Sequence, residues 1–285
     1  MSTVAILGAG PVASAIAHKL AERARVREIR LIDDKADVAA GKALDIRQSG
    51  PIGRFDTIVT GATGALSAVG AAAVVIADQA AGGEWQGEAG LALVREIERA
   101  GSKAPLIFSC ASQVWLMEAA ARELHVPPDR IVGTAASAVA ISVAALASVE
   151  AGQTGVSVAV AGRPPAFVIG WTSATVAGSA LSDRIPAHRL LAISNTLPKL
   201  WPPGPQTIGA ATAPVVEALL AGSRRVHHAM TVIDGDLGVR GVAAMLPLEL
   251  GNDRGNGRVL ARVIPSFSPQ ERTTLLSSLD GQRRR

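Results

Sequence analysis

Apolar residues in the first half of the chain form short runs that alternate with longer amphipathic segments. The runs are rich in Val, Ile and Leu, as in buried parallel strands, whereas the segments between them repeat their apolar residues with helical spacing. Regular alternation with short connections predicts a doubly wound parallel sheet, an α/β fold. The predicted strands are Thr3–Gly8, Glu28–Asp33, Asp56–Gly61, Ala72–Ala77 and Pro105–Ser109, and the predicted helices are Pro11–Leu20, Ala36–Ser49, Glu88–Ala100 and Gln113–Leu124.

The pattern changes after residue 133, where strands and helices no longer alternate regularly. Asp234-Gly235-Asp236 joins two alternating runs and predicts a hairpin. Ser268 and Glu271 have the spacing of a capping box, which predicts the start of a last helix. The chain therefore divides into a predicted α/β domain, residues 1–133, and an α+β domain, residues 134–285. The second half has predicted helices at Thr134–Ala151, Ala187–Leu200, Gln206–Leu220 and Ser268–Leu279, and strands at Val156–Ala161, Arg224–Ile233 and Val239–Leu248.

The first strand is followed by a G-x-G-x-x-A turn that opens a helix. Two glycines at this spacing allow a tight turn and a close approach of a diphosphate to the helix N-terminus. Asp33 ends the next strand, where an acid accepts hydrogen bonds from ribose hydroxyls and favours NAD over NADP; Asp34 could share this role. The alternative is a structural glycine turn that binds no nucleotide. The predicted cofactor-binding residues are Gly8, Gly10, Pro11, Val12, Ala13, Asp33 and Ala77.

Composition excludes several other classes of protein. Four Phe, four Trp and no Tyr leave a core of small and aliphatic residues, and the single Cys110 excludes an internal disulfide. The net charge of +4 owes much to Arg283, Arg284 and Arg285 at the end of the chain, and we find no recognised nucleic-acid-binding module. No apolar run is long enough for a membrane span, and no signal peptide is recognisable. We expect a cytoplasmic protein without nucleic-acid or membrane partners.

Several ordered motifs resemble the malate/lactate dehydrogenase family. They span nearly the whole chain, beginning with a GKALD helix and an RFDTIVTG strand. The motifs are Gly41–Asp45, Arg54–Gly61, Asp129–Gly133, Thr175–Gly178, Val216–Leu219 and Gly238–Val242. The resemblance implies a Rossmann-type NAD-binding domain, an oxidoreductase that exchanges a hydride with a 2-hydroxy acid, and a homo-oligomer to which the helix 134–151 could contribute.

The same resemblance implies that the family's catalytic residues are absent. Counted from the motifs, the position of the His acid/base carries Arg163, and that of its orienting Asp carries Val139. The Arg that binds the substrate carboxylate is replaced by Ser142, and the Asn after the fifth strand by Ala111. The mobile loop, residues 78–90, contains no Arg or Lys. An arginine cannot exchange protons near neutral pH, although Arg163 could bind a small molecule or anion, or pair with a nearby acid.

Other residues do not offer a replacement for the missing base. We expect none of the histidines to face the nicotinamide, and since two of them are adjacent on a strand, only one of that pair can point inward. They are His18, His125, His188, His227 and His228. Cys110 is expected to be a small buried residue. The sequence contains no HExxH helix and no paired Cys for zinc, so no metal is expected.

Three hypotheses follow. The first is an NAD(H)-binding relative of the family without ordinary 2-hydroxy acid dehydrogenase activity. The second is an active NAD-dependent oxidoreductase with an atypical substrate and a rewired active site, in which Arg163 or bound water acts differently. The third is an oligomeric scaffold that binds no cofactor.

Overall fold

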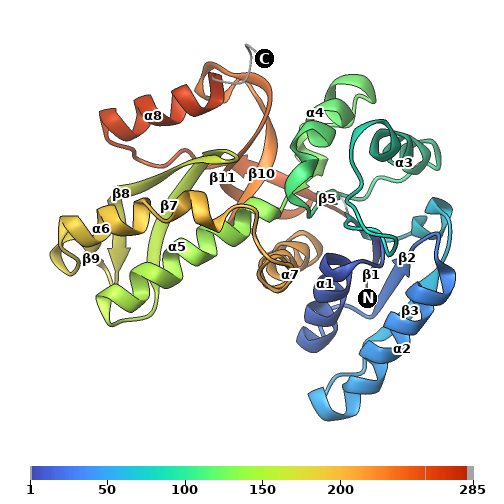
Figure 1. Cartoon of the computed structure of the whole chain (residues 1–285). Coiled ribbons are helices and arrows are strands. Elements are labelled where there is room, and N and C mark those ends of the chain that lie inside the picture. The colour runs from blue at the N-terminus through green and yellow to red at the C-terminus, as the bar shows by residue number, and fades with distance from the viewer. Residues whose placement is uncertain (1, 254, 281–285) are drawn as a thin grey trace.

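A computed structural model describes residues 2–253 and 255–280 and contains one mixed sheet. Its N-terminal part is parallel, in the order β3-β2-β1-β4-β5-β6. The strands are β1 Thr3–Leu7, β2 Glu28–Ile32, β3 Ile58–Ala62, β4 Ala73–Ile76, β5 Leu106–Phe108 and β6 Ile131–Gly133. The helices are α1 Pro11–Arg23, α2 Ala36–Gly53, α3 Gly87–Arg99 and α4 Val114–Glu123 (Figure 1). The predicted doubly wound α/β fold is confirmed.

The two faces of this sheet are buried by alternate residues of the same strand. Val4 and Ile6 of β1 pack into the core that includes α1 and α2, whereas Ala5 and Leu7 pack into the core that includes α3 and α4. Successive side chains of a strand point to opposite faces, so a strand covered on both faces is apolar throughout. This is why the sequence shows continuous apolar runs rather than alternation.

The C-terminal half extends the same sheet with antiparallel strands. The strands are β7 Val156–Arg163, β8 Ala166–Val176, β9 Ser179–Ala180, β10 Val226–Asp234, β11 Arg240–Asp253 and β12 Asn256–Arg262. The helices are α5 Ala135–Ala151, α6 Ala187–Ser194, α7 Pro205–Ala221 and α8 Pro269–Asp280. β10 joins the halves, with Met230 opposite Gly133 of β6. The predicted hairpin lies between β10 and β11, and Ser268 and Glu271 form the predicted capping box.

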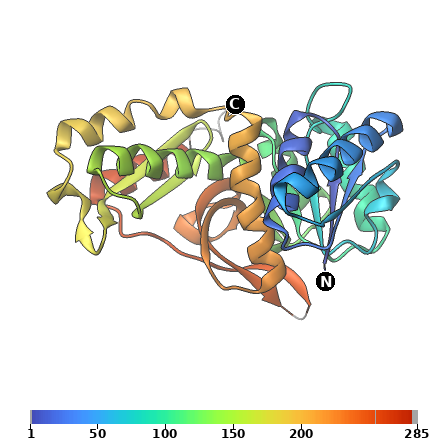
Figure 2. The same ribbon diagram turned by 90° about the horizontal axis from the view of Figure 1, so that it is seen from below.

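Helix α7 stands between the two halves of the molecule and packs against α1 (Figure 2). A Cβ at Gly209 of α7 would lie 2.8 Å from the backbone of Ala15, so the two helices meet closely at a residue without a side chain. Arg23 of α1 donates two hydrogen bonds, of 2.6 and 2.7 Å, to the buried Glu217 of α7. These contacts fix the C-terminal half against helix α1.

One predicted helix is shorter in the structure, and four strands were not predicted. The helix predicted over 187–200 ends at Ser194, and a 3-10 turn, Leu197–Leu200, follows it because Pro198 cannot continue the α-helical hydrogen bonds. The strands that were not predicted are β6, β8, β9 and β12. Arg283, Arg284 and Arg285 lie outside the described residues. None of the helices in the described part of the chain combines the length and apolarity of a membrane span.

Candidate functional site

The glycine turn between β1 and α1 has no free backbone donor. Pro11 lacks an N–H, and each other N–H from residue 8 to residue 14 donates to an acceptor in the chain. The donors and acceptors are Gly8 to the carbonyl of Ile32 (2.7 Å), Ala9 to Asp33 (3.0 Å), Gly10 to the carbonyl of Asp78 (2.9 Å), Val12 and Ala13 to the carboxylate of Asp78 (3.0 and 2.8 Å), and Ser14 to the carbonyl of Gly10 (3.0 Å).

Asp78 follows β4 and places its carboxylate at the N-terminus of α1. Oδ2 accepts from Val12 and Oδ1 from Ala13, so both oxygens cap the first helical turn. A negative group is favoured there by the helix dipole. A Cβ on Gly10 would lie 2.3 Å from Cγ of Asp78, and one on Gly8 would lie 2.1 Å from its carbonyl oxygen. Both glycines therefore make room for Asp78.

The turn as it stands does not fit a diphosphate. A phosphate bound there needs the N–H groups of the first turn, and those of Val12 and Ala13 are already bonded to a carboxylate of the same sign as the ligand. The structure brings together the predicted cofactor residues Gly8, Gly10, Pro11, Val12, Ala13, Asp33 and Ala77, and the N–H of Ala77 donates to the carbonyl of Leu7. Their proximity is as expected, but their donors are used within the chain.

Asp33 is also occupied, although not completely. Its Oδ2 accepts from Ala9 (3.0 Å) and Ala80 (2.9 Å), and its Oδ1 accepts from Lys35 (3.0 Å). A carboxylate has about four lone-pair positions, so Asp33 can accept about one more hydrogen bond. Asp33 and the exposed Asp34 line a cavity of about 300 Å³ at the carboxyl ends of β1 and β2.

The segment from Asp78 to Gln86 forms a short loop that is fixed at both of its sides. Glu84 accepts a hydrogen bond from the backbone of Ser112 (2.8 Å), and Gln113 donates to the carbonyl of Trp85 (3.1 Å). Since Asp78 accepts hydrogen bonds from the first turn of α1, the loop is bonded both to α1 and to the 3-10 turn Ala111–Gln113 before α4. The family resemblance implies that this loop is mobile. In the structure it is held by hydrogen bonds that two of its own acids, Asp78 and Glu84, accept.

Arg163 forms a buried ion pair with Glu118 of α4. Its guanidinium donates to both carboxylate oxygens, and Oε1 of Glu118 also accepts from the backbone of Ala243 (2.8 Å). The two side chains are 11% and 12% exposed. Of the alternatives left open by the sequence, the structure shows the pairing of Arg163 with a nearby acid.

The other positions at which the resemblance implies catalytic residues carry apolar or uncharged side chains. Val139 is fully buried in the core of α5, Ser142 is half-buried on the same helix, and Ala111 begins the turn before α4. Burial raises the pKa of the Cys110 thiol, as do Glu84 and Asp78 nearby, so this thiol stays protonated at neutral pH. Among the described residues, no cluster of three or more His, Cys, Asp or Glu could hold a metal ion.

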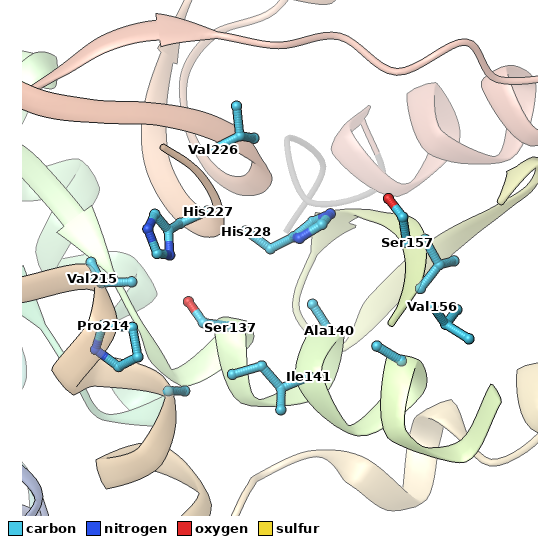
Figure 3. A pocket seen from close by; sticks show the side chains of 13 residues that line it. Ser137, Ala140, Ile141, Val156, Ser157, Pro214, Val215, Val226, His227 and His228 are labelled. Carbon is cyan, nitrogen blue, oxygen red and sulfur yellow. The ribbon is translucent and has the colours of Figure 1, made fainter. Parts of the chain in front are cut away.

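The histidines are dispersed, apart from one pair. His18 stacks edge to face with Phe55, and His125 and His188 are exposed. His227 and His228 line one cavity of about 310 Å³ between α5, α7, β7 and β10 (Figure 3). Both Nε2 atoms are buried without a partner among the described residues. The expectation that only one of them points inward is therefore wrong, a result that the strand period alone did not indicate.

Burial makes both of these histidines neutral. Burial lowers the pKa of His227, and the nearby positive charge of Arg225 lowers it further. Burial lowers the pKa of His228 to about 4, with a smaller lowering by His227. No charged side chain lines the cavity. Neutral imidazoles in an apolar cavity cannot serve as acids at physiological pH.

The lowered pKa of His228, which is half-buried with its Nε2 atom inaccessible, predicts that stability falls in mild acid. The unfolded chain takes up a proton near pH 6.5, whereas the folded chain does so only near pH 4. Stability should therefore decrease as the pH falls through this interval, by up to about 3 kcal/mol. Urea unfolding from pH 7 to pH 4 measures this slope. His228→Leu should flatten it and the exposed His188→Leu should not; equal slopes in both variants would contradict the assignment.

These observations define the class of protein. The chain has a Rossmann-type parallel domain with a glycine turn at its first helix, extended by an antiparallel half. Proteins of this class bind ligands at the carboxyl ends of the parallel strands, where the turn, Asp33 and the loop from Asp78 meet.

The chain is similar to malate dehydrogenases over most of its length. The chain is 26% identical to malate dehydrogenase of Thermomicrobium roseum over 98% of this chain and 96% of that protein, and 26% identical to that of Chloroherpeton thalassium over 87% of each. A shorter match, 45% identical over 58 residues, spans only 19% of the malate dehydrogenase of Chlorobium phaeobacteroides. No family model matches the chain.

Solved structures agree in fold. The minor L-lactate dehydrogenase of Enterococcus mundtii superposes with a TM-score of 0.85 over 99% of this chain and 96% of that chain, at 18% identity. Malate dehydrogenase of Salinibacter ruber gives 0.83 over 97% and 93%, at 22% identity. The long sequence matches and the shared fold together support membership of the malate/lactate dehydrogenase family.

Proposed function

We propose that this chain is a malate/lactate dehydrogenase-like protein without ordinary 2-hydroxy acid dehydrogenase activity. The observation that carries the proposal is the buried ion pair between Arg163 and Glu118, at the position where the family resemblance requires an imidazole. Reduction of a 2-oxo acid needs a proton at the developing alkoxide when the hydride arrives. A guanidinium held by a carboxylate neither gives nor takes that proton at neutral pH.

The substrate side supports the same conclusion. A bidentate arginine orients a carboxylate, and Ser142 and Val139 offer neither its charge nor its fork of donors. An orienting acid without its histidine would be a costly buried charge, and Val139 avoids that cost. Loss of a general acid/base alone lowers rates about 10²–10⁴-fold, and loss of orientation adds to this.

The sequence hypothesis also includes NAD(H) binding. The cavity beside Asp33 and Asp34 supports binding of the nucleoside part of NAD(H). The N–H groups of Val12 and Ala13 are already hydrogen-bonded to Asp78, which disfavours binding of the diphosphate part. We therefore propose the loss of activity independently of NAD(H) and treat NADH as a ligand to be tested. The homo-oligomer and the cytoplasmic location stay predictions; Ile141, Leu146 and Val149 form an exposed apolar stretch of α5 that suits an interface.

An absorbance assay of NADH oxidation tests the proposal. We expect no turnover of oxaloacetate, pyruvate or longer 2-oxo acids above the rate without protein, while malate dehydrogenase of Thermomicrobium roseum serves as the active control. A cooperative thermal transition of the same sample establishes that it is folded. Turnover of a 2-oxo acid at about 10 s⁻¹, an ordinary enzyme rate, would refute the proposal. Turnover confined to aldehydes or ketones without a carboxylate would instead establish the alternative, an oxidoreductase with an atypical substrate.

A further inference from the structure

The cavity beside Asp33 has an apolar part that suits an aromatic ring. Ile32 lies at the end of β2, and Trp85 and Leu93 come from the loop after β4 and from α3. The cavity volume of about 300 Å³ is at the lower end of the range for small-molecule sites. An aromatic ring would pack against these apolar side chains.

The polar part of the cavity is entirely acidic. Asp33, Asp34 and Glu96 line it, and none of its lining residues is Lys or Arg. Asp34 has no hydrogen-bond partner within the described ranges, and Asp33 can accept about one further bond. Carboxylates accept hydrogen bonds from hydroxyl groups and repel anions. The cavity therefore favours a ligand that carries hydroxyls and no negative charge.

The cavity ends where a dinucleotide would have to continue. None of residues 8–13 of the glycine turn lines it. Beyond Asp33 the N–H groups of Val12 and Ala13 hold the Asp78 carboxylate, and the backbone carbonyl of Asp78 holds Gly10. A phosphate attached to a ligand in the cavity would meet a carboxylate in place of free donors.

We propose that the carboxylate of Asp78 is a built-in substitute for the diphosphate, and that the adjacent cavity binds an uncharged nucleoside rather than a dinucleotide. The Asp78 carboxylate accepts hydrogen bonds from the N–H groups at the N-terminus of α1 in the absence of any ligand. A nucleoside offers the aromatic ring and the two neighbouring hydroxyls that the cavity and its carboxylates match, and it has no phosphate to compete with Asp78. This inference concerns binding and does not rest on the absence of dehydrogenase activity.

The substitute is fixed in place by its neighbours. Glu84 and Trp85, a few residues after Asp78, are hydrogen-bonded to Ser112 and Gln113 at the start of the next helical segment. Moving Asp78 away from α1 would therefore disturb the loop at both of its sides. Two hydrogen bonds to a charged group must break before a phosphate binds, which corresponds to a loss of affinity of at least about 100-fold.

Isothermal titration with adenosine and with NADH tests the proposal. The wild-type chain should bind adenosine and show no heat of NADH binding at millimolar concentration. Asp78→Ala frees the N–H groups of Val12 and Ala13 and removes the like charge, so NADH affinity should rise at least about 100-fold while adenosine affinity changes little. Asp37→Ala is the matched control, because this exposed acid of α2 touches neither the turn nor the cavity.

Each result decides one part of the proposal. Equal NADH affinity in the wild type and in Asp78→Ala overturns the substitution of the diphosphate by Asp78. Failure of the wild type to bind adenosine overturns the nucleoside site. A rise in NADH affinity in Asp37→Ala as large as in Asp78→Ala shows that only net charge matters. This result also overturns the substitution of the diphosphate by Asp78. Thermal melts of both variants, each with a cooperative transition, establish that the comparison is between folded proteins.

Discussion

Glu118→Gln is expected to destabilise the folded protein by about 3 kcal/mol, because it leaves the guanidinium of Arg163 buried without a counter-charge. Both side chains are nearly nine-tenths buried, so water cannot replace the lost carboxylate. The same change weakens the hydrogen bond that Glu118 accepts from Ala243 of β11. Urea unfolding measures the effect as a lower midpoint at unchanged slope.

Two further variants separate a buried pair from a simple loss of packing. Glu118→Leu combined with Arg163→Met removes both charges, and its stability should return to within about 1 kcal/mol of the wild type. Glu123→Gln on the same helix breaks an exposed pair with Arg122 and should cost less than about 0.5 kcal/mol. If Glu118→Gln costs no more than Glu123→Gln, the pair is not a buried structural element, and Arg163 is available for another role.

Gly8→Ala is expected to abolish folding, not merely ligand binding. The backbone of Gly8 has φ = +123°, and a Cβ there would lie 2.1 Å from the carbonyl oxygen of Asp78. The steric clash cannot relax, because the backbone of Asp78 is held by its hydrogen bond from Gly10. The cost should exceed about 4 kcal/mol, and circular dichroism should show no cooperative thermal transition.

A second glycine isolates the effect of backbone conformation. Gly82 has φ = +88° and open space where a Cβ would be, so Gly82→Ala should cost only about 1–2 kcal/mol. A phosphate-binding role for Gly8 predicts the opposite order, a folded Gly8→Ala protein that has lost a ligand. Recovery of such a protein with wild-type stability would show that Asp78 does not fill the turn.

The fold was predictable because its signals are local. Apolar runs such as Thr3–Leu7 report burial on both faces of a strand, and Gly8 with Gly10 reports a turn that admits a close neighbour. Asp33 was correctly placed at the end of β2, next to that turn. That the family's catalytic residues are absent stays a prediction, made from ordered motifs and counting.

That Asp78 is the residue packed against the glycine turn was not predictable from such local signals. Asp78 lies 66 positions from Val12, and Glu118 lies 45 positions from Arg163. Each pair forms only when the sheet brings strand ends together. One signal was available for Asp78, because an acid directly after β4 faces the same sheet edge as the glycine turn. The shared cavity of His227 and His228 depends on packing between four elements, which no strand period reveals.

The most direct test combines an opened turn with the unchanged active-site positions. Asp78→Ala, saturated with NADH as judged by titration, is mixed with a panel of 2-oxo acids, and NADH absorbance is followed through a single turnover. The wild type is measured beside it. Because Arg163 and Glu118 remain paired, the account predicts that NADH is oxidised no faster than without protein, even with cofactor bound. Oxidation of one equivalent of NADH within seconds would contradict it, since a proton carrier must then act at that site.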